Sequence, residues 1–138
     1  MRKICPPILL LLTLCLIWLP GTAGAVEDPC MDNPDYLYLY TAFDGENYLQ
    51  RSSVVEDEYQ PPRCKLEGDV IHVPRADDGK IAKRHVIFRY DSDKQLASFY
   101  DEGTWYDVDA FGHSSADKRS LTLANVLYYA RYGVDFYR

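Results

Sequence analysis

Two aromatic-rich runs separated by a short polar loop constrain the fold of this chain more than any other feature. Residues 85–90 (HVIFRY) and 95–100 (QLASFY) flank the loop 91–94 (DSDK). β-Branched and aromatic residues favour strands, and Asp and Ser favour turns because their side chains bond the local backbone. The pattern therefore predicts a β-hairpin. Apolar side chains fall on both faces of the first run, which indicates a central strand.

Four other segments predict short strands around this hairpin. Residues 36–40 (YLYLY) alternate strictly, with leucines on one face and tyrosines on the other. Residues 48–51, 69–73 and 105–108 are shorter runs of the same kind. Residues 52–63 hold an acidic triplet and two adjacent prolines, so we expect a surface loop there.

The C-terminal part predicts a helix that begins near Ser115 or Ser120 and ends at Tyr132. Ser114 followed by Asp117 resembles a capping box, and Gly133 is a typical C-terminal stop. The helix would have an apolar stripe of Leu123, Val126, Leu127 and Ala130 and an opposite face of Asn125, Tyr128, Tyr129 and Tyr132. Residues 134–137 could return as a final strand or lie on the surface.

Strands followed by one helix place the chain in the α+β class, with mostly β structure. We expect a small twisted antiparallel sheet, or a partly closed barrel, with one C-terminal helix.

The N-terminal residues 1–25 have the features of a secretory signal peptide. Arg2 and Lys3 precede an apolar run, and small residues at positions 23–25 suit cleavage after Ala25. The run is too short to span a bilayer comfortably. We therefore expect a secreted protein, extracellular or periplasmic, with residues 26–138 as a single domain and no membrane contact after cleavage.

The acidic balance limits the partners of the mature chain. Cleavage removes Arg2 and Lys3 but no acidic residue, so the net charge of −6 becomes −8. Nucleic acids and anionic membranes bind basic surfaces. The charge therefore argues against both.

Cys30 and Cys64 are the two cysteines that remain after cleavage. Two cysteines in an exported chain most simply form one disulfide. We expect a Cys30–Cys64 bond, with intermolecular pairing or metal ligation as alternatives.

No motif of specific chemistry is present. His72, His85 and His113 lack the spacing of metal ligands, and no nucleophile elbow or Gly-rich phosphate loop occurs. Carboxylates near the strand ends could hold Ca²⁺ or act as acid and base; these are Asp91, Asp93, Asp101, Glu102, Asp107 and Asp109. Turn formation explains most of them equally well. We therefore assign no catalytic or metal-binding residues and no cofactor, and keep calcium as the one alternative.

The doubled pattern of inward leucines and outward tyrosines favours a binding protein over an enzyme. Tyr couples a large apolar area with a hydrogen-bonding tip, which suits recognition surfaces. The predicted binding residues are Tyr36, Tyr38, Tyr40, Tyr128, Tyr129 and Tyr132, with Arg131 as a charged anchor. The partner would be an extracellular protein that this chain binds or inhibits.

Three other functions stay open. Aromatic residues could instead line a cavity for a small apolar ligand, which would make the chain a carrier. The pairs Lys83-Arg84 and Lys118-Arg119 could be cut by processing proteases, which would make it a peptide precursor. A small secreted hydrolase that uses His113 or Asp107 is the third alternative.

Overall fold

The predicted central hairpin is confirmed in the computed structural model of the chain, which describes residues 28–76 and 79–138. Strands β4 (Ala82–Asp91) and β5 (Leu96–Asp101) pair antiparallel, with Phe88 opposite Phe99 and Tyr90 opposite Ala97. Asp91 closes the connecting turn, since its carboxylate accepts a hydrogen bond of 3.1 Å from the Lys94 backbone N–H.

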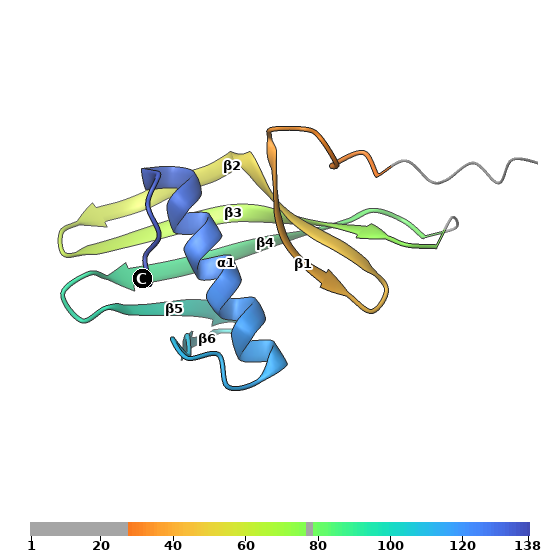
Figure 1. Cartoon of the computed structure of the whole chain (residues 1–138). Helices are drawn as coiled ribbons and strands as arrows, with labels where there is room; N and C mark the ends of the chain where they lie inside the picture. Colours follow the sequence, from red (N-terminus) through yellow and green to blue (C-terminus); the bar gives the residue numbers. More distant parts are fainter. Residues whose placement is uncertain (1–27, 77–78) are drawn as a thin grey trace, which may run out of the picture.

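The hairpin belongs to a six-stranded antiparallel sheet in which each strand pairs with the next along the chain (Figure 1). The other four strands are β1 (Tyr36–Ala42), β2 (Gly45–Gln60), β3 (Arg63–Pro74) and β6 (Thr104–Asp107). Helix α1 (Ser115–Tyr132) follows the last strand. The sheet does not close, so the α+β expectation is confirmed as an open sheet and not as a barrel.

The predicted surface loop at residues 52–63 is wrong, because most of it continues strand β2 and pairs with β3. Its acidic residues find partners that are distant in sequence. Glu56 contacts Arg131 and Tyr132 of the helix, and Asp57 forms an ion pair with Lys65 of β3. The many acidic residues in this segment led us to expect a solvated loop. Contacts with distant partners instead hold these acids on a strand.

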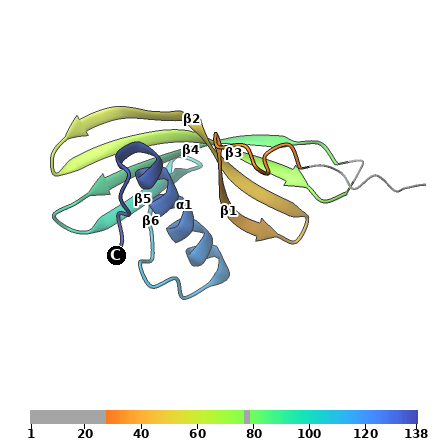
Figure 2. The same cartoon turned by 45° about the horizontal axis from the view of Figure 1, so that its top comes forward.

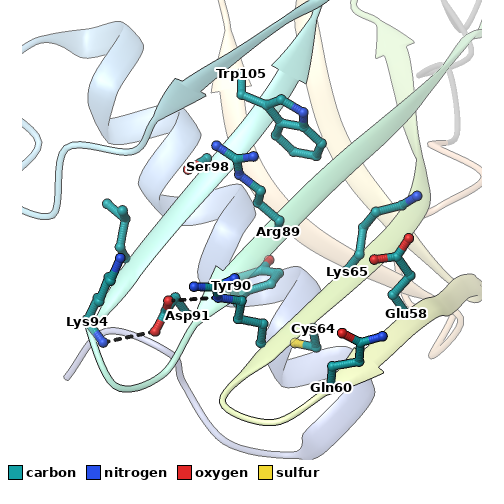
Figure 3. A pocket seen from close by; sticks show the side chains of 12 residues that line it. Glu58, Gln60, Cys64, Lys65, Arg89, Tyr90, Asp91, Lys94, Ser98 and Trp105 are labelled. Atoms are coloured by element: carbon teal, nitrogen blue, oxygen red, sulfur yellow. Dashed lines mark hydrogen bonds and ion pairs between the residues drawn. The ribbon is translucent and has the colours of Figure 1, made fainter.

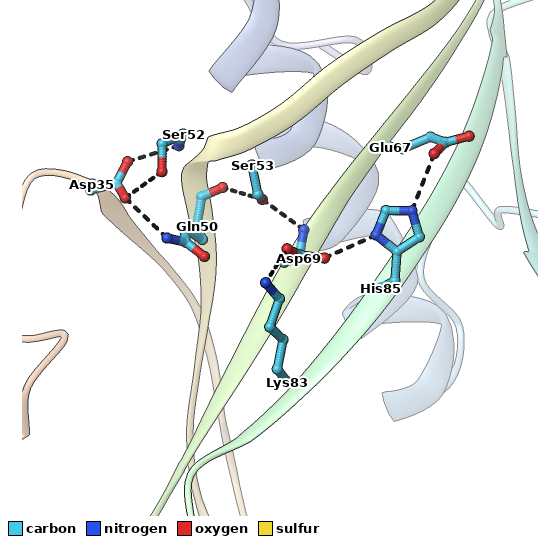
Figure 4. Close-up of polar contacts among 8 residues, drawn as sticks. All are labelled: Asp35, Gln50, Ser52, Ser53, Glu67, Asp69, Lys83 and His85. Carbon is cyan, nitrogen blue, oxygen red and sulfur yellow. Dashed lines mark hydrogen bonds and ion pairs between the residues drawn. The ribbon is translucent and has the colours of Figure 1, made fainter.

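Strand β2 is irregular in its middle, where its register with β3 shifts between Gln50 and Val55. Polar side chains support the irregular stretch (Figure 4). Asp35 accepts hydrogen bonds from the backbone N–H and hydroxyl of Ser52, at 2.7 and 2.6 Å. Ser53 accepts a bond of 2.8 Å from the Asp69 backbone N–H. Backbone groups freed from the ladder are thus partly satisfied by side chains.

Helix α1 begins and ends as its sequence predicts. Ser114 and Asp117 form a reciprocal capping box, and Gly133 ends the helix in the left-handed region with φ of 75°. Leu123, Ala124 and Leu127 are its buried residues. Tyr128 and Tyr132, expected on the opposite face, pack against the core because they follow Ala124 at intervals of four residues.

The helix lies on one face of the sheet (Figure 2). The main core lies between the helix and this face. The sheet contributes Leu49, Leu66, Val70, Phe88 and Tyr90 to this core. The Tyr90 hydroxyl donates a hydrogen bond of 2.8 Å to the Ala124 carbonyl oxygen. This contact joins the central hairpin to the helix.

Residues 134–137 form neither a strand nor a free surface segment. Phe136 is buried in the main core. The Tyr137 backbone N–H donates to Asn125 Oδ1 at 2.9 Å, and the Tyr137 hydroxyl accepts from the Ala97 N–H at 2.8 Å. The C-terminal segment therefore ties the helix to β5.

The expected Cys30–Cys64 disulfide is absent, and both thiols are free and buried. Cys64 faces the helix, whereas Cys30 packs with Tyr48, Ile71 and Val73 in a smaller cluster on the other face. Cys64 and Ile71 are seven residues apart on β3, which corresponds to about 23 Å of strand. A disulfide needs Cα atoms within about 7 Å. The number of cysteines suggested a Cys30–Cys64 bond, but the positions of their neighbours along β3 keep the two thiols apart.

The predicted signal segment at residues 1–25 lies outside the described residues. No helix within residues 28–76 and 79–138 has the length and hydropathy needed to cross a membrane.

Candidate binding groove

Strand alternation leaves one face of the sheet free of the helix. On β3, Cys64, Leu66 and Val70 face the helix, so Lys65 and Glu67 point to the opposite side. We call that side the open face. The N-terminal segment around Cys30 covers one end of it through contacts with Tyr48, Ile71 and Val73. No residue in the described part of the chain covers the other end, which carries polar and charged side chains.

A groove of about 530 Å³ crosses this uncovered end (Figure 3). Its lining comes from β2 through β6 and includes Leu96, Ser98 and Trp105. Small-molecule sites commonly have volumes of about 300–1,000 Å³. The groove is therefore large enough for a small organic ligand.

Trp105 supplies the aromatic part of the groove. It is half-buried, lies opposite Tyr100 in the β5–β6 register and has its ring centroid 5.2 Å from that of Tyr100. The Arg89 guanidinium carbon lies 4.5 Å from the Trp105 centroid, within cation–π distance. A flat apolar surface and a positive charge are thus placed side by side.

Ser98 adds a fixed polar group at the back of the groove. Only 2% of this residue is exposed, and its hydroxyl donates a hydrogen bond of 2.7 Å to Asp107 Oδ1. The hydroxyl hydrogen of Ser98 is therefore already bonded to Asp107, but the hydroxyl oxygen can still accept a hydrogen bond.

Ion pairs order the side chains around the groove. Arg63 lies 3.3 Å from Asp91, and the hydrogen bond from the Lys94 backbone N–H is the main reason that the pKa of Asp91 is lowered. Lys65 pairs with Asp57 and lies 3.6 Å from Glu67. The hydrogen bond to Asp57 is the main cause of the raised pKa of Lys65. Lys65 therefore remains charged at neutral pH.

A second polar cluster adjoins the groove along β3 and β4 (Figure 4). His85 Nδ1 lies 2.9 Å from Asp69 Oδ1, and His85 Nε2 lies 3.2 Å from Glu67 Oε2. Lys83 Nζ lies 2.6 Å from Asp69. The hydrogen bond with Asp69, and then that with Glu67, raises the pKa of His85. Within the described part of the chain no three His, Cys, Asp or Glu residues are grouped so as to hold a metal ion.

Three of the six carboxylates that were considered as calcium ligands have local partners in the structure. Asp107 accepts from Ser98, and Asp91 pairs with Arg63. Asp109 accepts from the Phe111 backbone N–H at 2.8 Å and contacts His113. The His113 contact is the main cause of the lowered pKa of Asp109.

The structure places the three predicted tyrosines of β1 on both sides of the sheet. Tyr36 packs beside the smaller cluster, and Tyr38 is 55% exposed with its ring at 5.9 Å from that of Tyr48. The pairing with β2 shifts between Tyr38 and Tyr40. Tyr40 consequently packs against the main core, with the Arg119 guanidinium 5.3 Å from its centroid.

The predicted residues of α1 lie elsewhere. Tyr128 and Tyr132 are half-buried with ring centroids 4.6 Å apart, and Tyr129 is 44% exposed. Tyr132 and Arg131 both contact Glu56, the latter at 3.3 Å. The structure therefore gathers Tyr128, Tyr132 and Arg131 near β2, and it does not join them to the β1 tyrosines in one surface.

The two dibasic pairs lie inside regular secondary structure. Lys83 and Arg84 belong to β4, where they pair with Ile71 and Val70 of β3. Lys118-Arg119 falls in the first turns of α1. Cleavage at either pair in the folded chain would first require local unfolding.

The residues that line the groove were not predicted as a site. The alternation of His85, Ile87 and Arg89 on β4 contained the signal, because it places Arg89 on the face opposite the core residues Phe88 and Tyr90. The strand expected before it covered only residues 69–73, so Lys65, the register partner of Arg89 on the neighbouring strand β3, was not placed on the sheet.

Comparison of the chain with protein-family models, with curated proteins and with solved structures finds no match.

Proposed function

We propose that this protein binds a small ligand and that the ligand occupies the groove on the open face of the sheet. The observation that carries the proposal is a groove of about 530 Å³ in which half-buried Trp105 is the aromatic surface. Ligand sites combine apolar contact area with a few fixed polar groups. Trp105 provides the former, and Ser98 and Arg89 provide the latter.

This proposal revises the carrier alternative, because the site is an open groove and not an enclosed cavity. It retains export of the chain, which rests on the signal-like residues 1–25. An intact mass that begins at Val26 in the medium of producing cells would support export. A full-length mass inside the cells alone would contradict it.

The test is a titration with small naphthalene derivatives, followed by NMR. The reporter is the indole N–H signal of Trp105, the one tryptophan of a chain that begins at Val26. We expect at least one derivative to shift this signal saturably. If none shifts it at millimolar concentration, the proposed function is wrong.

A matched pair of variants locates the binding. Trp105→Ala should weaken binding, whereas Tyr106→Ala should not. Tyr106 is the next residue of the same strand, is 47% exposed and stacks on Phe99 at 5.5 Å. Because alternate residues of a strand face opposite sides, it lies away from the groove. Equal losses in the two variants would place the ligand elsewhere.

A second candidate is recognition of an extracellular protein, as the tyrosine pattern suggested. The observation that favours it is the exposure of aromatic residues at the β1–β2 hairpin. Phe43 is 98% exposed and Tyr38 is 55% exposed. Pull-down from extracellular fluid with Phe43→Ser as the comparison tests this function. A partner retained equally by the variant and the native chain would argue against this surface.

A further inference from the structure

Two positive side chains stand directly opposite one another in the groove. Lys65 of β3 and Arg89 of β4 are register partners in the antiparallel pair, so both project from the open face (Figure 3). Like charges in directly opposed cross-strand positions are destabilising. An arrangement of this kind is unfavourable unless a negative group reduces the repulsion.

Among the described residues, carboxylates pair with Lys65 but not with Arg89. Asp57 and Glu67 both lie within ion-pair distance of Lys65. Arg89 forms no ion pair with any residue within 28–76 and 79–138, and its described neighbour is the Trp105 ring. The guanidinium therefore keeps its hydrogen-bond donors free for an external acceptor.

The cations of the groove differ in how their charge is offset. Four cations line it, Arg63, Lys65, Arg89 and Lys94, against two acids, Glu58 and Asp91. Asp57 and Glu67 add two carboxylates beside Lys65, and Asp91 pairs with Arg63. Arg89 is thus a positive group of the groove that pairs with no described carboxylate, on a chain whose net charge is −6.

We propose that the ligand of the groove is a small organic acid with an aromatic ring, whose oxyanion lies between Lys65 and Arg89. This inference rests on the proposed function and adds the ligand class. The planar guanidinium of Arg89 suits an oxyanion, which can accept two parallel N–H bonds. The ring of the ligand then lies against the Trp105 side of the groove, next to the Arg89–Trp105 contact.

The decisive comparison uses two probes of nearly equal shape, 1-naphthaleneacetate and the neutral 1-naphthaleneacetamide. Calorimetry gives the affinity of each, and the Trp105 indole signal reports that the groove is occupied. We expect the acid to bind about 10- to 100-fold more tightly than the amide, the range for one charge-assisted hydrogen bond. Added salt should weaken the acid more than the amide.

Arg89→Gln should remove most of the preference for the acid and leave the amide affinity nearly unchanged. The matched control is Arg84→Gln. Arg84 has the same charge on the same strand, but it pairs with core residue Val70 and so faces the helix side. Both arginines are exposed, so neither change should unfold the chain, and thermal melts check this.

The outcomes separate the inference from the function on which it rests. Saturable Trp105 shifts with equal affinities for acid and amide would keep the groove as a ligand site and overturn the oxyanion inference. An acid preference that survives Arg89→Gln would also overturn it. No Trp105 shift with either probe would refute the ligand-binding function itself.

Discussion

The closeness of α1 to the sheet can be tested at Gly68, a β3 residue beneath the helix. A Cβ added there would lie 3.0 Å from Leu127 Cδ1 and 3.3 Å from Leu49 Cδ1. Both leucines are fully buried, at 0% exposure, so neither side chain can move into solvent. The glycine therefore sets how near the helix can pack.

Two opposing effects determine the result of Gly68→Ala. Replacing a strand glycine by alanine favours folding by about 0.5–1 kcal/mol, through reduced freedom of the unfolded chain. Forcing a methyl group into a filled core costs about 1–3 kcal/mol. Since the contact at 3.0 Å requires Leu127 to shift, we expect a net loss of about 1–2 kcal/mol.

A double-mutant cycle with Leu127→Ala identifies the cause. Leu127→Ala alone should cost about 2–5 kcal/mol, because it leaves a cavity. In that background the crowding of position 68 is relieved, so Gly68→Ala should be neutral or stabilising. The coupling free energy should be about 1–3 kcal/mol. The control is the same cycle with Leu123→Ala, another buried residue of α1, which should give a smaller coupling.

Urea denaturation measures all four corners of the cycle, and unchanged m-values ensure that the midpoints report stability. The reasoning is refuted if Gly68→Ala stabilises the native chain. It is also refuted if the effects of Gly68→Ala and Leu127→Ala add to within about 0.5 kcal/mol.

Three further measurements test separate contacts. Tyr90→Phe removes the buried hydrogen bond to Ala124 and should lower the free energy of unfolding by about 1–2 kcal/mol in urea, and an unchanged midpoint would contradict it. The hydrogen bond with Asp69 raises the pKa of His85 in the folded chain. The contribution of this contact to stability is therefore complete below the pKa of His85 in the unfolded chain, about 6.5, and is lost as pH rises through the higher pKa of the folded chain. NMR titration should show the raised pKa and its decrease in Asp69→Asn, and an unperturbed value would refute the contact. Both described cysteines should react with iodoacetamide slowly when folded and rapidly in denaturant, whereas a mass that rises by two hydrogens on reduction would reveal a disulfide.

Local sequence signals predicted the parts of the fold that depend on neighbouring residues. The β4–β5 hairpin follows from two β-forming runs around a polar turn, and the helix ends follow from Ser114 with Asp117 and from Gly133. These features need few distant contacts, because turn and cap side chains bond their own segment of backbone.

Sequence reasoning failed where distant residues decide the structure. Residues 52–60 have the composition of a loop, yet pairing with β3 and contacts of Glu56 to the helix make them strand. The tyrosines of β1 have a strict alternation, yet the irregular pairing before Tyr40 turns that side chain toward the core. A single bulge reverses the facing of every later residue, and its position cannot be obtained from alternation alone.

The sequence by itself determined the α+β class, the central hairpin and the capped C-terminal helix, because periodicity and turn chemistry are local properties. Only the tertiary structure decided that Cys30 and Cys64 lie on different faces and that Lys65 stands opposite Arg89 beside Trp105. The physical reason is register. Which side chains meet across a sheet depends on how the strands pair along their whole length, so the candidate site exists only after the strands have paired.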